Sequence, residues 1–210
     1  MEGVRRALIA AAVVAVACGP EPVAVPAPAV AVPADREAIA TDPARSRGLT
    51  QWGAGTLDER EAMYVRLAND VAPAAAPTTF TGKLANWPVN GRISSPFGPR
   101  WGGFHNGLDV AAPMNTPVLA ALPGQVAAAG RPYLAYGDTA VIVIVVHDPG
   151  FVTLYVHLDE TRLPPVKVGD KVKAGDVLGY VGLTGWTTGP HVHFMTVVNG
   201  RAVNPLQYLP

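Results

Sequence analysis

The second half of the chain, from about residue 88 to the end, alternates short apolar runs with turns rich in glycine, proline and asparagine. Short runs of β-branched and aromatic residues between such turns predict strands, and no stretch here keeps a helical period. The run 139–147 is apolar on both faces, which predicts a buried central strand followed by a turn at 148–150. We therefore expect an all-β fold, a small antiparallel two-sheet or barrel-like domain built around a groove. The runs expected to form its strands are 118–122, 125–129, 139–147, 151–158, 177–181 and 191–198.

Charge and cysteine content exclude several classes of function. The chain carries 16 Lys and Arg against 16 Asp and Glu, and residues 88–210 carry eight against seven. Without a basic stripe or charge run, we expect no nucleic-acid partner. Cys18 is the one cysteine of the sequence, which rules out internal disulfides and cysteine-ligated zinc.

The first 17 residues have the pattern of an export signal. Arg5 and Arg6 give a positive start, and the apolar run 7–17 has eleven residues, fewer than the roughly 20 needed to span a bilayer. The sequence Ala-Val-Ala-Cys at its end resembles a bacterial lipobox, and it also fits a plain A-x-A cleavage site. We favour lipidation of Cys18, because nothing else in the sequence explains the cysteine at that place. We therefore expect an exported lipoprotein, periplasmic or on the cell surface and anchored to a membrane.

Two segments separate this signal from the β-rich half. Residues 18–34 are rich in proline, alanine and valine, which predicts an extended tether. Residues 35–87 form a spacer with one credible helix at 57–71, where Thr56 and Glu59 form a capping-box pair. Two interpretations of the spacer stay open: a solvated segment with a short docking helix, or a latency segment that folds back over a site in the second half.

Four of the five histidines occupy three short motifs: H-N-G-L-D (105–109), L-Y-V-H-L (154–158) and H-V-H-F (191–194). Strand alternation places His191 and His193 on one face, with Val192 and Phe194 on the other. Two imidazoles at i and i+2 are about 7 Å apart, which suits one metal ligand and one neighbour, although both could bind. In 153–158 the same alternation puts Thr153, Tyr155 and His157 on one face and leaves Leu154, Val156 and Leu158 for the core.

His105 and Asp109 are four residues apart with Gly107 between them, and no helical pattern surrounds them. We expect both on a turn that enters a strand. A catalytic zinc ion needs three protein ligands and a vacant position for water. Two imidazoles and one carboxylate would satisfy that need, although either motif alone arises easily by chance. His147 ends the buried strand, and we assign it no role.

The sequence around these motifs makes the interpretation specific. It includes S-P-F-G-P-R at 95–100, H-N-G-L-D-V, L-Y-V-H-L, V-G-D-K-V-K-A-G-D-V-L-G, T-G-P-H-V-H-F and V-N-P-L-Q-Y-L. In this order the motifs closely resemble the lysostaphin-type (LytM-like) zinc metalloendopeptidases of bacterial cell walls, over about residues 93–208. The resemblance implies a peptidase domain of the duplicated hybrid motif type, at 88–210. It also implies one Zn²⁺ per chain, bound by His105, Asp109 and His193, with His157 and His191 as the catalytic pair beside the metal-bound water.

By the same resemblance, the chain would be an endopeptidase that hydrolyses peptide bonds in peptidoglycan, in stem peptides or cross-bridges, and we expect a monomer. Which of His157 and His191 acts as the base stays open. An alternative from another class is an exported regulator without activity, which binds and activates other cell-wall hydrolases. Because all five expected side chains are present, the enzyme is the favoured interpretation. Met195, Thr188 and Asn115 depart from residues common in the family, which bears on substrate preference.

Overall fold

The computed structural model describes residues 57–71, 78, 80–100, 103–134 and 138–210. The expected export signal, Cys18, the tether and the capping residue Thr56 lie outside the described residues. Within the described residues, no helix combines the length and the apolarity that a bilayer span requires.

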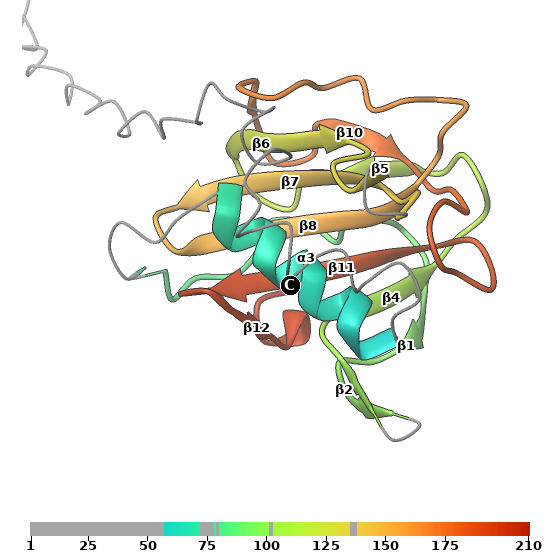
Figure 1. The fold of residues 1–210 in the computed structure, drawn as a ribbon. Helices are drawn as coiled ribbons and strands as arrows, with labels where there is room; N and C mark the ends of the chain where they lie inside the picture. Colours follow the sequence, from blue (N-terminus) through green and yellow to red (C-terminus); the bar gives the residue numbers. More distant parts are fainter. Residues whose placement is uncertain (1–56, 72–77, 79, 101–102, 135–137) are drawn as a thin grey trace, which may run out of the picture. The chain divides into compact units, whose positions relative to one another are not determined.

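One large antiparallel sheet forms the body of the described fold (Figure 1). Its strand order is β1-β4-β11-β8-β7-β6-β9, and β12 pairs with β11. Two further sheets, β5 with β10 and β2 with β3, have two strands each. The bounds in the large sheet are β1 Arg92–Ser95, β4 Leu108–Ala111, β11 His191–Val198, β8 Phe151–Leu158, β7 Val141–Asp148, β6 Gly124–Gly130, β9 Lys171–Val172 and β12 Arg201–Val203. The remaining elements are β2 Gly98–Arg100, β3 Gly103–His105, β5 Pro117–Leu119, β10 Val177–Tyr180, the helix α3 Leu57–Val71 and the 3₁₀ turn η2 Pro205–Gln207.

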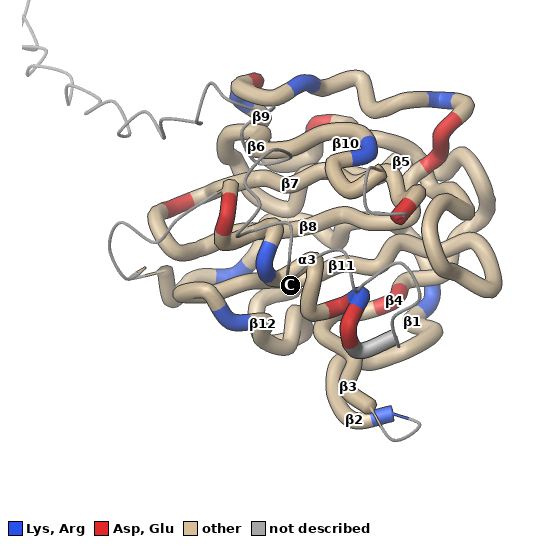
Figure 2. Tube along the Cα trace, viewed as in Figure 1, with Lys and Arg blue, Asp and Glu red and all other residues tan. Residues whose placement is uncertain are grey.

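The described fold confirms the all-β prediction and corrects its details. The sheets do not close into a barrel, and the expected strand 118–122 is shorter, at Pro117–Leu119. The expected central strand is β7, whose first six residues are buried, and every residue of its neighbour β8 is buried as well. Figure 2 shows the same pattern, because the tube through β8 and β11 carries no charged residue.

The main hydrophobic core lies on one face of the large sheet. Alternate residues of β7 and β11 pack there against the small sheet, through Val118 of β5 and Leu178 of β10. Burying one such apolar side chain contributes about 1.5–3 kcal/mol. The sheet members of this cluster include Leu108, Val110, Val126, Val141, Val143, Val145, Tyr155, Val192 and Phe194.

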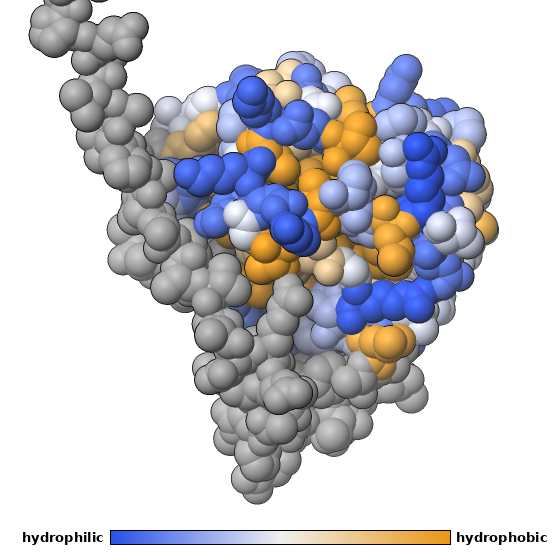
Figure 3. Space-filling view, turned by 90° about the horizontal axis from the view of Figure 1, so that it is seen from above, coloured by the Kyte–Doolittle hydropathy of each residue, from blue (hydrophilic) through white to orange (hydrophobic). Residues whose placement is uncertain are grey.

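The opposite face is covered in part by α3, which contacts β3 and β8 (Figure 1). The helix spans the predicted range and buries Met63, Tyr64, Leu67 and Ala68. Near its end, Asn69 donates from Nδ2 to the carbonyl of Gly200, at 3.2 Å. The outer surface is mixed in character, since Figure 3 shows separate groups of hydrophobic residues among hydrophilic ones.

A β-bulge in β8 overturns the predicted alternation of that strand. Tyr155 pairs with Val143 and Leu158 with Val141, so two residues of β8 lie opposite one residue of β7. His157 has φ of +66°, in the left-handed region that non-glycine residues rarely adopt. Tyr155 and Leu158 both face the main core as a result, whereas His157 faces the other side with His191. The predicted grouping of His157 with Thr153 and Tyr155 is therefore wrong.

Candidate metal centre and active site

Three side chains from three strands converge beside α3. His105 ends β3, Asp109 lies in β4 and His193 lies in β11, directly opposite Asp109 in the strand register. The Oδ1 atom of Asp109 is 3.1 Å from Nε2 of His105 and 2.9 Å from Nδ1 of His193, and these two nitrogens are 3.1 Å apart. Donors around a tetrahedral zinc ion lie about 3.3 Å apart, so this trio needs only a small outward shift to hold one. The turn expected between His105 and Asp109 is limited to 106–107, since both residues lie in strands.

The hydrogen bonds around the trio favour a metal as well. Nδ1 of His105 donates to the carbonyl of Pro96, at 2.7 Å, which leaves the lone pair of Nε2 directed at Asp109 and His193. Metal-binding histidines are usually oriented in this way by their second nitrogen. Nε2 of His193 is buried and has no hydrogen-bond partner among the described residues, so Nδ1 is the nitrogen directed at Asp109. The donor set of two imidazoles and one carboxylate thus fits Zn²⁺.

Gly107 allows the close approach of these strands. A Cβ atom on Gly107 would lie 2.6 Å from Cε1 and 2.8 Å from Nε2 of the His193 ring, and 2.8 Å from the carbonyl oxygen of Phe194. No real side chain tolerates such contacts, so the glycine of H-N-G-L-D is needed for packing and not for turn geometry.

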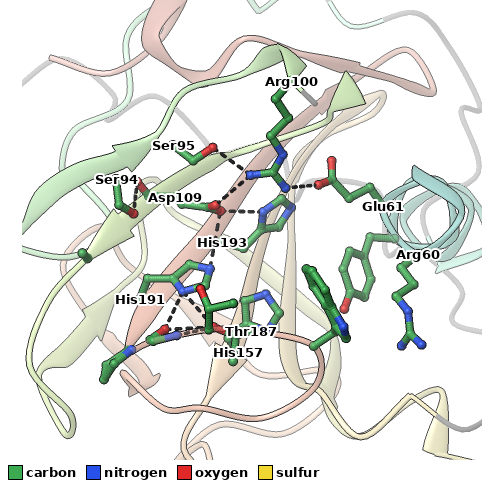
Figure 4. A pocket seen from close by; sticks show the side chains of 16 residues that line it. Arg60, Glu61, Ser94, Ser95, Arg100, Asp109, His157, Thr187, His191 and His193 are labelled. Carbon is green, nitrogen blue, oxygen red and sulfur yellow. Dashed lines mark hydrogen bonds and ion pairs between the residues drawn. The ribbon is translucent and has the colours of Figure 1, made fainter. Parts of the chain in front are cut away.

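Arg100 fixes the orientation of the Asp109 carboxylate (Figure 4). Its Nη1 donates to Oγ of Ser95 at 2.7 Å and lies 3.4 Å from Oδ2 of Asp109, which leaves Oδ1 for the two histidines. Burial would raise the pKa of Asp109, but hydrogen bonds with His105 and His193 outweigh it and hold that pKa below its usual range. The carboxylate is therefore charged at neutral pH, as a metal ligand must be.

His157 and His191 lie side by side next to this trio, with ring centroids 4.8 Å apart. Nδ1 of His157 donates to the carbonyl of Thr184 at 2.7 Å, and Nδ1 of His191 donates to the carbonyl of Gly189 at 2.8 Å. Each ring therefore keeps Nε2 as an acceptor in its neutral form, and Nε2 of His191 is 3.6 Å from Oδ1 of Asp109.

Burial keeps both of these imidazoles neutral. Burial, and then the neighbouring His191 and His193, lower the pKa of His157 to about 3. Burial also lowers the pKa of His191, against the opposing effect of the Asp109 carboxylate. Both side chains can therefore accept a proton at neutral pH, which is what general-base chemistry needs.

A pocket of ≈ 420 Å³ opens over the trio and the histidine pair (Figure 4). One wall comes from β1 and β4, a second from the loop between β10 and β11, and a third from α3. Trp186, which is 53% exposed, belongs to the second wall. The lining residues are Arg60, Glu61, Tyr64, Ser94, Ser95, Arg100, Asp109, Ala111, His157, Trp186–His191 and His193.

Sequence reasoning assigned no role to two charged residues of this pocket. Arg100 ends the S-P-F-G-P-R motif, and its position there was the available signal. Glu61 had no signal beyond its place in a predicted helix, yet its carboxylate can join His105 and His193 in a group whose ligand atoms lie within 4.8 Å of one another. Of the residues that depart from the resembled family, Met195 is fully buried and Thr188 lines the pocket.

Comparison with known sequences places this site in a family. Residues 103–205 match the model of Peptidase family M23. The chain is 41% identical over 131 residues to the cell division protein DipM of Caulobacter vibrioides, a match that covers 59% of this chain and 20% of DipM. It is 41% identical over 122 residues to the DD-carboxypeptidase/endopeptidase Mpg of Neisseria meningitidis, covering 55% of this chain and 26% of Mpg. It is also 35% identical over 124 residues to the murein hydrolase activator NlpD of Escherichia coli, covering 59% and 31%.

The matched region thus spans between a fifth and a third of these relatives. Among solved structures, a putative M23 peptidase from Pseudomonas aeruginosa is similar, with a TM-score of 0.57 and 34% identity, over 71% of this chain and 60% of that one. A zinc-containing peptidase from Vibrio cholerae has a TM-score of 0.52 and 31% identity, over 60% and 40%. The family model, the sequence relatives and the shared fold agree that the chain belongs to peptidase family M23.

Proposed function

We propose that the protein is a zinc-dependent endopeptidase that hydrolyses peptide bonds in peptidoglycan. The observation that carries this proposal is the joint placement of three metal donors, 2.9–3.1 Å apart, with two imidazoles whose Nε2 atoms are free to accept a proton. The name of Mpg, a DD-carboxypeptidase/endopeptidase, supports the same type of reaction.

In this proposal Nε2 of His105, Oδ1 of Asp109 and Nδ1 of His193 hold the zinc ion. Bound zinc supplies Lewis-acid activation of a peptide carbonyl and of a water molecule. His157 and His191 divide the remaining work. One Nε2 accepts the proton of the attacking water and returns it to the leaving amine, and the other ring, once protonated, donates a hydrogen bond to the developing oxyanion. The hydrogen bonds of their Nδ1 atoms to Thr184 and Gly189 hold both rings in position for these roles.

The test is direct. Purified protein with zinc, incubated with sacculi, should release new amino termini, and a chelator should abolish the release until zinc is restored. If no amino termini appear and the chelator changes nothing, the protein is not a peptidoglycan endopeptidase. Mass spectrometry of the released fragments identifies the bond that is cut.

A second candidate is a regulator that binds and activates other wall hydrolases. The similarity to NlpD, a murein hydrolase activator, supports it, and so does the fact that Arg60, Glu61 and Tyr64 of α3 line the pocket. Adding the protein to sacculi together with a separate wall amidase distinguishes the two. An activator raises the amidase rate while releasing no amino termini of its own.

We further propose that the chain is exported and anchored through a lipid on Cys18, which lies outside the described residues. The apolar leader and the Ala-Val-Ala-Cys sequence support this proposal. Labelling growing cells with a radioactive fatty acid should mark the wild-type protein and leave the Cys18→Ala variant unmarked. A label that persists in the variant rules out this anchor.

A further inference from the structure

We propose that Glu61 of α3 is a fourth protein ligand of the metal, and that α3 thereby closes the site. This inference rests on the proposed zinc site formed by His105, Asp109 and His193. It adds a regulatory state to that site: a closed form, in which a carboxylate of the same chain occupies the position that a catalytic zinc keeps for water.

The position of the carboxylate carries the first step. Oε1 of Glu61 is 4.0 Å from Nε2 of His105, and Glu61 can contribute a ligand atom that lies within 4.8 Å of those of His105 and His193. Neighbouring donors of a tetrahedral zinc ion are about 3.3 Å apart, so a movement of less than about 1 Å brings Glu61 into the coordination shell. Carboxylate oxygens are ordinary zinc ligands, at about 2.0–2.2 Å.

The burial of Glu61 carries the second step. The residue is only 3% exposed, and a glutamate is rarely buried unless both of its oxygens are satisfied. Nη2 of Arg100 donates to Oε1 at 2.7 Å, and the backbone N–H of Asn106 donates to Oε2. Arg100 also reaches Asp109, so one guanidinium orients both carboxylates toward the same space, as Figure 4 shows.

The packing of α3 carries the third step. Besides Glu61, its Tyr64 lies against the site: the ring centroid is 6.0 Å from that of His193, and the hydroxyl hydrogen-bonds to Asp138. Met63, Leu67 and Ala68 are buried on the same helix, one turn further along. Arg60, Glu61 and Tyr64 together form one wall of the pocket above the metal donors.

Two consequences follow from this arrangement. A water molecule and the Glu61 carboxylate cannot occupy the same coordination position, so hydrolysis requires α3 to move away. A peptide that enters the pocket has to displace the same helix. The rival explanation is that Glu61 serves only as the ion-pair partner of Arg100, and it predicts no change at the metal when Glu61 is altered.

The experiment uses the full chain with Glu61→Gln, and Glu59→Gln as the matched control. Glu59 lies on the same helix, is exposed and is absent from the pocket lining, so its variant loses the same charge away from the metal donors. Zinc affinity is measured by competition with a chelator, and the ligand set by the visible spectrum of the Co²⁺-loaded protein. Access to the metal is measured by the binding of acetohydroxamate, a small metal-directed probe.

Glu61→Gln should weaken zinc binding by roughly ten-fold or more, shift the Co²⁺ spectrum and bind acetohydroxamate at least about ten-fold more tightly. Hydrolysis of sacculi should rise in parallel, and Glu59→Gln should change none of these. Glu61→Asp, which keeps the charge but shortens the reach, should resemble Glu61→Gln at the metal; it also serves if the glutamine variant folds poorly.

Unchanged zinc affinity and an unchanged spectrum in Glu61→Gln would show that Glu61 is only a partner of Arg100. Equal acetohydroxamate binding in the variant and the unaltered chain would overturn the closure of the site by α3. If no variant hydrolyses sacculi, the proposed peptidase function fails, while the affinity, spectrum and probe measurements still decide the role of Glu61.

Discussion

Gly107→Ala is the sharpest test of how the metal donors are packed. The added Cβ would lie 2.6 Å from Cε1 of His193, where ordinary van der Waals contact begins near 3.4 Å, so the ring has to move by about 0.8 Å. The other neighbour, the carbonyl oxygen of Phe194 at 2.8 Å, is backbone within β11 and has little freedom to move. We expect zinc affinity to fall by roughly 10–100-fold and the free energy of unfolding of the metal-free protein to fall by about 1–3 kcal/mol.

The assay is chelator competition for zinc affinity, combined with denaturant unfolding of the metal-free protein. Gly189→Ala is the matched control, because a Cβ there meets nothing within 4 Å; its zinc affinity and unfolding free energy should equal those of the unaltered chain. If Gly107→Ala binds zinc as tightly as the unaltered chain and unfolds at the same denaturant concentration, His193 is not held in the way that the structure indicates, and the metal site has to be reconsidered.

Three further predictions concern side chains near the site and in the core. His157→Ala and His191→Ala should each lower hydrolysis of sacculi by roughly 10²–10⁴-fold while zinc affinity stays within about two-fold, and a parallel loss of zinc would instead make the altered histidine a ligand. Thr184 is buried, accepts from the N–H of Val141 at 2.9 Å and donates to the carbonyl of Leu158 at 2.6 Å; Thr184→Val should lower the free energy of unfolding by about 1–3 kcal/mol, and urea unfolding with no such loss contradicts this. Burial lowers the pKa of His147 from 6.5 to about 4, so the unfolded chain binds that proton more tightly and the stabilisation, complete above pH 6.5, is lost as the pH falls toward 4. In His147→Gln the loss of stability between pH 7 and 4.5 should be smaller by about 1–2.5 kcal/mol, and equal pH profiles would refute it.

The regular elements were predictable because their periodicity is a local property of the chain. The helix at Leu57–Val71 and the strands β8 and β11 have the predicted bounds. In β11 the alternation also gave the correct faces, since Val192 and Phe194 pack in the core and His193 is turned to the metal donors. A strand that keeps its regular pleat reveals the direction of every side chain in the sequence alone.

The bulge in β8 shows where this reasoning stops. A period of two assigns His157 to the face of Tyr155, but the extra residue and the positive φ at His157 turn its ring to the opposite face. Nothing in the letters of 151–158 marks the irregularity, because bulges depend on the register with the neighbouring strand. The site gains from it, since the bulge brings His157 to within a ring-to-ring distance of 4.8 Å from His191. A functional histidine was thus identified by its motif while its direction was predicted wrongly.

The helix α3 was predicted in its position but not in its partners, and its sequence explains why. Its apolar residues are unevenly spaced, which made the buried face hard to define. In the structure the buried positions are Glu61, Met63, Tyr64, Leu67 and Ala68, which follow the 3.6-residue period once a glutamate and a tyrosine are counted among them. A glutamate on the inward stripe of a helix needs a cation to compensate for its burial, and that cation is Arg100, which lies 39 residues further along the chain. A sequence that interrupts an apolar stripe with a carboxylate therefore indicates a helix that packs on a charged site and not on a hydrophobic core.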